Sequence, residues 1–140
     1  FDVGNNENYF NDVLNDKILN RVARNCYLPA NALLLKLIRQ YPQIRVAFSI
    51  SGVTLDQLEA NAPEVIDSFK ALADTGAVEF IAETYYHSLA SLNDTDEFEQ
   101  QVRMHAEKIY NCFGVRPTVC RNTELIYSNA IGSRMHAMGF

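Results

Sequence analysis

The sequence predicts an α/β fold built on parallel strands, and three observations support this. Short apolar runs alternate with amphipathic helical patterns along the 140 residues, an order typical of parallel strands joined by right-handed crossovers. The first run is apolar on both faces, as expected of a buried parallel strand. The polar residues that end successive runs, Ser51, Glu83 and Glu124, are separated by 32 and 41 positions, close to the roughly 31 residues that a (β/α)8 barrel uses per unit.

A barrel and an open doubly wound sheet both fit this spacing. No glycine-rich phosphate-binding pattern follows any of the apolar runs. This absence disfavours the nucleotide-binding version of the open sheet.

The first third of the sequence predicts a loop followed by two helices. Residues 1–15 are rich in Asn and Asp and lack periodicity, which indicates a surface loop. Asp16 is placed to cap a short helix. Pro29 suits the first turn of the next helix, and Pro42 ends that helix.

The next segment predicts a strand and two helices. Residues 46–51 form the first strand candidate. Thr54 and Gln57 have the spacing of a capping box that opens a helix. A second helix begins at Pro63, and Gly76 is predicted at its C′ position, where a left-handed conformation is favoured.

The last part of the sequence predicts two further strands and two helices. Residues 78–82 form the second strand, and the polar loop 83–88 follows it. A long amphipathic helix is predicted over 94–113. The third strand is 118–121, and 129–138 is again helical.

The composition indicates one globular domain. Apolar residues make up 48% of the sequence and charged residues 21%. A net charge of -5 with only 12 Lys and Arg argues against a nucleic-acid partner, and no apolar run is long enough for a membrane span. The first and last residues lack the features of natural termini, so we expect 1–140 to be an internal fragment. The three cysteines, Cys26, Cys112 and Cys120, are widely spaced, and we interpret them as reduced thiols in a cytoplasmic protein.

Each predicted strand changes abruptly from apolar to polar at its carboxyl end. We call these three polar ends, 49–51, 83–88 and 121–124, the rim. Parallel strands place such ends on one edge, so two carboxylates, an imidazole, a guanidinium and several hydroxyl or amide groups are expected to converge. This arrangement suits a hydroxyl-rich ligand. The alternative is that these residues only start loops and cap helices.

Glu124 is the leading catalytic candidate, as a nucleophile or a proton donor, because carboxyl pairs perform both tasks in glycoside hydrolysis. Alternatively, it lies in the first turn of the following helix. Arg121 would keep Glu124 ionised if the two side chains meet. Glu83 and His87 are candidates for binding sugar hydroxyls. The rings of Tyr85 and Tyr86 suit either stacking on a sugar or packing. His105 and His136 lie on predicted helices away from the rim, and we expect surface or core positions for both.

Three segments, 121–128, 82–90 and 26–31, together resemble glycoside hydrolase family 57, in particular its α-amylase-like branch. The resemblance covers essentially the whole sequence. It implies an incomplete (β/α)7 barrel that acts on α-glucans with retention of configuration, by hydrolysis or by 4-α-glucan transfer. No metal or other cofactor is implied.

The resemblance also implies roles for individual residues. Glu124 takes the position of the nucleophile, and Glu83 lines the substrate cleft; His87 and Arg121 are expected to bind substrate beside it. A histidine motif would precede Phe1 and the aspartate acid/base would follow Phe140, so the isolated 140 residues are expected to be inactive and poorly soluble.

Two alternatives remain open. A metal-dependent polysaccharide deacetylase would need a His/His/Asp cluster at the strand ends, where only His87 is available. A non-catalytic glycan-binding or regulatory homologue would keep Glu124 and lack the acid.

Overall fold

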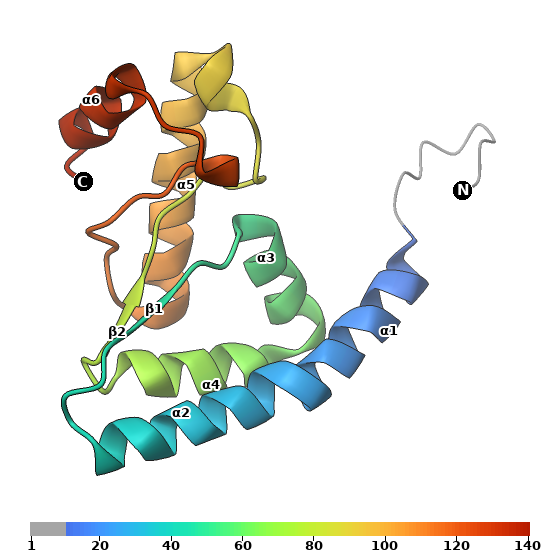
Figure 1. Ribbon diagram of the computed structural model, residues 1–140. Coiled ribbons are helices and arrows are strands. Elements are labelled where there is room, and N and C mark those ends of the chain that lie inside the picture. Colours follow the sequence, from blue (N-terminus) through green and yellow to red (C-terminus); the bar gives the residue numbers. More distant parts are fainter. Residues whose placement is uncertain (1–10) are drawn as a thin grey trace.

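The computed structural model describes residues 11–140 and shows a mostly helical α/β protein with two parallel strands (Figure 1). The elements in chain order are α1 (Asp12–Val22), η1 (Ala23–Tyr27), α2 (Leu28–Gln40), β1 (Val46–Phe48), α3 (Gly52–Asn61), α4 (Pro63–Ala73), β2 (Val78–Phe80), η2 (Ala90–Leu92), α5 (Thr95–Phe113), η3 (Thr123–Leu125) and α6 (Asn129–Ala137).

The first helices form one long rod, because the π-helical turn η1 joins α1 to α2 without a break (Figure 1). The predicted cap at Asp16 is wrong. Asn11 caps α1 instead, and its side chain accepts a hydrogen bond from the backbone N–H of Leu14 at 3.0 Å. Residues 11–15, predicted as loop, therefore cap and begin this helix, whereas 1–10 lie outside the described residues.

Helix α3 begins earlier than its predicted capping box. Ser51 is extended, and its hydroxyl accepts from the backbone N–H of Thr54 at 3.3 Å, so Ser51 is the cap and the predicted Thr54–Gln57 pair is not. The first helical residue, Gly52, lies against the ring of Tyr85: a Cβ there would lie only 2.5 Å from the ring atoms. Only glycine allows this close approach of α3 to the segment after β2.

The predicted helix ends agree closely with the structure. Pro63 is the first residue of α4. Gly76 is left-handed at φ +68°. It lies one position beyond the predicted C′ position, because the C-cap of α4 is Asp74. The long helix α5 is capped by Asp94, and Gly114 ends it in the left-handed conformation.

The sheet is smaller than predicted, although its strands are parallel as expected. β1 and β2 pair in the register Phe48↔Phe80, and each has only three residues. The predicted third strand, 118–121, is reduced to one parallel bridge between Ala82 and Cys120. At the end of β1 the chain leaves the sheet at once, because Ser51 already caps α3.

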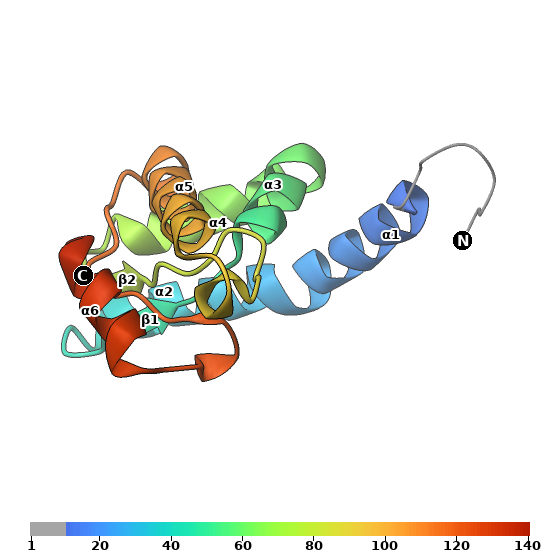
Figure 2. The ribbon, with the colours of Figure 1, turned by 90° about the horizontal axis from the view of Figure 1, so that it is seen from above.

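The main core lies between the strands and helices α2, α4 and α5, which cover them (Figure 2). An aromatic group forms its centre: the Phe80 ring stacks on Phe113 with centroids 4.2 Å apart, and Phe69 meets Phe48 edge to face at 5.1 Å. A smaller cluster around Phe98 packs α5 against α6.

Within residues 11–140, no helix has the length and apolar character needed to cross a membrane. The three cysteines are unpaired thiols.

Candidate active site

The three segments of the rim meet in the structure, as predicted. Ser49 Oγ donates to Glu83 Oε1 at 3.0 Å, which joins the first segment to the second. The hydroxyls of Thr84 and Thr123 are 2.6 Å apart and join the second to the third. Ser51 is the exception, since its hydroxyl is engaged at the start of α3.

Glu83 lies at the centre of the rim. The residue is 2% exposed, and its carboxylate contacts Ser49, His87 and Arg121; the Arg121 guanidinium is 3.6 Å away. A carboxylate removed from water requires cations or hydrogen-bond donors around it. Three side chains from three segments of the chain meet this requirement at one carboxylate.

His87 links the two glutamates of the rim. Its Nδ1 is 3.2 Å from Glu83 Oε2, and its Nε2 is 3.2 Å from Glu124 Oε1. The hydrogen bonds to Glu83 and then to Glu124 raise the pKa of His87 above its usual value. The imidazolium is therefore favoured between the two carboxylates.

Glu124 extends from the rim into solvent, with 69% of its side chain exposed. It lies in the 3-10 turn η3, whereas the following helix α6 begins at Asn129 with Ser128 as its cap. The alternative that placed Glu124 in the first turn of that helix is thus wrong.

Backbone strain is concentrated at the rim and at the residue directly after it, Leu125. Among the described residues, three residues other than glycine have positive φ: His87 at 53°, Glu124 at 53° and Leu125 at 57°. His87 and Glu124 are also hydrogen-bonded to each other. Each such conformation costs on the order of 1–3 kcal/mol and persists only where the surroundings enforce it, most often at functional sites.

The Arg121 guanidinium pairs with Glu83 and not with Glu124. The contact through which Arg121 would keep Glu124 ionised is therefore not formed. The Nε of Arg121 is buried without a hydrogen-bond partner. Beside it, the Asn122 amide donates to the backbone carbonyl of Ile126 at 2.9 Å and to Ser91 Oγ at 2.8 Å. These bonds hold the turn that carries Glu124.

Tyr85 and Tyr86 differ in role. Tyr85 is a packing residue, and its hydroxyl donates to the carboxylate of Asp56 at 2.8–2.9 Å; burial and this carboxylate raise its pKa to about 12. Tyr86, also in the rim, is 55% exposed, and its ring meets that of Tyr85 edge to face with centroids 5.0 Å apart. The exposed part of the Tyr86 ring can contact a ligand, as the sequence allowed.

Sequence reasoning assigned no functional role to two polar residues that support the rim from α5. His105 has the buried position that the sequence allowed, but the expectation that it lies away from the rim is wrong, because it accepts a hydrogen bond from the backbone N–H of Glu83. Gln101, 4% exposed, accepts from Ser88 Oγ at 2.9 Å and from the backbone N–H of Tyr86 at 3.3 Å. The signal for both was their position within the apolar stripe of a helix, where a polar residue requires a partner. His136, by contrast, is exposed.

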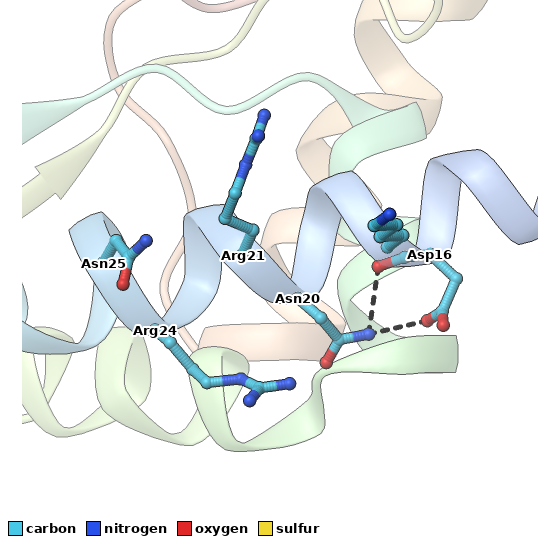
Figure 3. A pocket seen from close by; sticks show the side chains of 6 residues that line it. Asp16, Asn20, Arg21, Arg24 and Asn25 are labelled. Atoms are coloured by element: carbon cyan, nitrogen blue, oxygen red, sulfur yellow. Dashed lines mark hydrogen bonds between the residues drawn. The ribbon is translucent and has the colours of Figure 1, made fainter.

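Two pockets differ in their relation to the rim, because the first is lined by rim residues 49–51 and the second is not. One of about 330 Å³ adjoins the carboxyl end of β1 and is lined by Phe48, Ser49 and η1 and α2 residues such as Tyr27 and Asn31. A second, of about 500 Å³, is an open depression along α1 and η1 (Figure 3). All six of its lining residues lie within 16–25, so none belongs to the rim.

Parallel strands whose carboxyl ends gather one buried and one exposed glutamate around an imidazole define an α/β protein with a carboxylate site, the type of site that glycoside hydrolases use. Residues 1–140 match Glycosyl hydrolase family 57. The chain belongs to this family, which confirms the resemblance seen in the sequence.

Individual relatives agree with this assignment. A protein of Methanocaldococcus jannaschii named "Putative alpha-amylase" is 45% identical over 135 residues, which cover 96% of this chain and 29% of the relative. An alpha-amylase of Pyrococcus horikoshii is 36% identical over 84 residues, or 59% of this chain and 13% of the relative.

The fold is likewise similar to that of a solved structure. The 4-alpha-glucanotransferase of Thermococcus litoralis superimposes with a TM-score of 0.74 at 17% identity, covering 89% of this chain and 19% of that protein. At this identity the similarity shows the fold alone. The chain thus spans less than a third of the length of each of these three proteins.

Proposed function

We propose that these residues form part of a retaining enzyme that acts on α-glucans, by hydrolysis or by 4-α-glucan transfer, within an incomplete (β/α)7 barrel. Glu124 is the nucleophile in this proposal, and Glu83, His87 and Arg121 position and bind the sugar. The family, the amylase names of the relatives and the fold of the glucanotransferase support the substrate class.

One observation carries the role of Glu124: it is the exposed carboxylate of the rim, on a strained backbone, and His87 holds it at 3.2 Å. A nucleophile must be ionised and accessible to the anomeric carbon. The raised pKa of His87 favours a cation beside the Glu124 carboxylate, and the exposed side chain of Glu124 is accessible.

In the proposed reaction, the Glu124 carboxylate forms a bond to the anomeric carbon while the bond to the leaving glycosyl oxygen breaks, and that oxygen takes a proton from a second carboxyl group. Water or a sugar hydroxyl then releases the covalent intermediate with net retention. The two carboxyl groups in such enzymes are about 5–5.5 Å apart. Glu83 is unsuited as the proton donor, because its carboxylate is buried and already engaged by Ser49, His87 and Arg121.

The test uses the complete protein in which this chain occurs. Glu124→Gln should lower the turnover of maltooligosaccharides by several orders of magnitude while folding, followed by circular dichroism, survives. Glu64→Gln, an exposed carboxylate on α4, is the matched control and should leave turnover unchanged. Unaltered turnover in Glu124→Gln would place the nucleophile elsewhere.

A second variant separates a nucleophile from a proton donor. Glu124→Gly removes the carboxylate and suits the positive φ at this position. Azide can occupy the vacated space, attack the anomeric carbon and yield a glycosyl azide of inverted configuration. Retention in the azide product, or no azide product from an activated glycosyl fluoride, contradicts the assignment. Glucan binding without turnover in the wild type would favour the non-catalytic homologue.

A further inference from the structure

The hydrogen-bond ladder between β1 and β2 is interrupted at the rim by a side chain. The last ladder bond runs from the backbone N–H of Ile81 to the carbonyl of Phe48 at 2.8 Å. In a parallel pair the next bond on this side would join the N–H of Glu83 to the carbonyl of Ile50. Instead, Glu83 N–H donates to Nδ1 of His105 at 3.0 Å, and Nε2 of His105 is 2.7 Å from the Ile50 carbonyl oxygen.

These two bonds determine the state of the His105 ring. Nδ1 accepts, so it carries no proton, and Nε2 must donate to a carbonyl, so it carries one. The ring is therefore the neutral Nε2–H tautomer. Its environment agrees, because the residue is fully buried and burial lowers the pKa of His105.

We propose that His105 is a positioning residue of the active site, acting as a wedge that separates the ends of β1 and β2 and sets the position of Glu83. This rests on the proposed function. Without the ring, the two backbones would meet at a hydrogen-bond distance of about 2.9 Å. With it, they are separated by the width of an imidazole, and the Glu83 carboxylate reaches Ser49 and His87, the residue that contacts Glu124.

The opposite side of the same segment shows that the separation is local. There, Ala82 N–H donates to the carbonyl of Val119 at 2.9 Å, and Arg121 N–H donates to the carbonyl of Ala82 at 2.8 Å. This is ordinary parallel pairing one residue before Glu83. The strand ends are parted on the side where Ser49 meets Glu83 and remain paired on the other.

Helix α5 holds the loop after β2 at a second point on the same face. Gln101 is one helical turn before His105, so both side chains point the same way. Gln101 accepts from Tyr86 and Ser88, while His105 accepts from Glu83. The loop that carries His87 is thus attached to α5 near both ends, and His105 provides the attachment nearer to Glu83.

Two substitutions separate the bonds of the ring. His105→Asn places an oxygen near the position of Nδ1 and keeps the acceptor for Glu83. His105→Gln places an amide nitrogen near the position of Nε2 and keeps only the bond to Ile50. We expect kcat on maltooligosaccharides to fall about 10- to 100-fold in His105→Gln, with a smaller change in KM, because misplaced groups cost rates of this order. His105→Asn should retain much more of kcat, and exposed His136→Asn all of it.

A measurement on the wild type tests the wedge independently of activity. Nitrogen-15 spectra of the histidine-labelled complete protein should show His105 as the Nε2–H tautomer at neutral pH. Exchange of the Glu83 amide with solvent should accelerate at least 10-fold in His105→Gln and little in His105→Asn. A proton on Nδ1 in the wild type overturns the proposal, whether or not the variants fold, and so does equal kcat in the two variants.

The outcomes also separate this inference from the proposed function. A wild type without activity on α-glucans would remove the proposed function, while the tautomer and the Glu83 exchange rates would still decide whether His105 is the wedge. An active wild type whose His105→Gln variant keeps full kcat would remove this inference and leave the role of Glu124 intact.

Discussion

The body of the sheet and the rim at its carboxyl edge both contain buried side chains, yet these are of opposite chemistry. Beside the strands, the core consists of apolar side chains such as Phe69, Phe80 and Leu72, in ordinary backbone conformations. A few residues further along, the buried groups are polar, with Glu83 2% exposed and Thr84 fully buried.

This difference teaches what each region contributes. Burying apolar surface stabilises a fold at roughly 25 cal/mol per Å², whereas burying polar groups is at best neutral unless each finds a partner. The rim and Leu125, the residue directly after it, in addition hold the three positive-φ residues other than glycine in the described part of the chain. A stable fold alone does not need this arrangement, which supports the proposal that the body stabilises the molecule and the rim serves chemistry.

The largest effect should come from the body. Phe80→Ala removes a ring that is 2% exposed and stacked on Phe113, and we expect a loss of about 3–5 kcal/mol in the free energy of unfolding. Denaturant unfolding of the complete protein measures it. Leu33→Ala, at a residue 56% exposed, should change stability by no more than about 0.5 kcal/mol. Activity per folded molecule should survive in Phe80→Ala. Its loss would contradict the assignment of stability to the body and activity to the rim.

The second effect should be on activity and should come from the rim. Glu83→Gln removes the charge that Arg121 and His87 surround. We expect kcat/KM on maltooligosaccharides to fall about 100-fold, which corresponds to about 2.7 kcal/mol. Glu79→Gln, on β2 four residues before Glu83 and with its side chain exposed, is the matched control and should remain active. Full activity in Glu83→Gln would reduce its carboxylate to a structural group.

A third, smaller effect tests whether the backbone strain at Leu125, directly after the rim, serves function. Leu125 is 72% exposed with φ +57°, so Leu125→Gly relieves about 1 kcal/mol of strain and loses part of it through the greater freedom of the unfolded chain. We expect stability to be equal or slightly higher and turnover to fall, because the turn carrying Glu124 loosens. Leu92→Gly, at an exposed residue of η2, should only destabilise. Lower stability in Leu125→Gly would show that the conformation is unstrained.

The sequence predicted the rim better than it predicted the sheet. Apolar runs with polar ends are local patterns, so the convergence of Glu83, His87 and Glu124 followed from parallel strands alone. The partner of Arg121 could not be predicted in this way, because Glu83 and Glu124 are both within reach of a long side chain. Local patterns could not identify the partners of His105 either, since Glu83 and Ile50 are 22 and 55 residues away in sequence. The predicted third strand, 118–121, forms only the bridge between Ala82 and Cys120. The length of a strand depends on backbone geometry that residue types do not encode.

The smallest effect is the pH dependence of the link between the two carboxylates. The pKa of His87 is raised by Glu83 first and by Glu124 second, so its contribution to stability is complete below the ordinary pKa of about 6.5 and is lost as pH rises through the raised value. The stability difference between wild type and His87→Gln should therefore shrink from pH 6 to pH 9. Since 46% of this side chain is exposed, solvent screening keeps the difference below about 1 kcal/mol. The same comparison in a Glu83→Gln background should show a weaker pH dependence, because the larger cause is gone. A difference that grows with pH would mean that neutral imidazole, rather than imidazolium, joins the two glutamates.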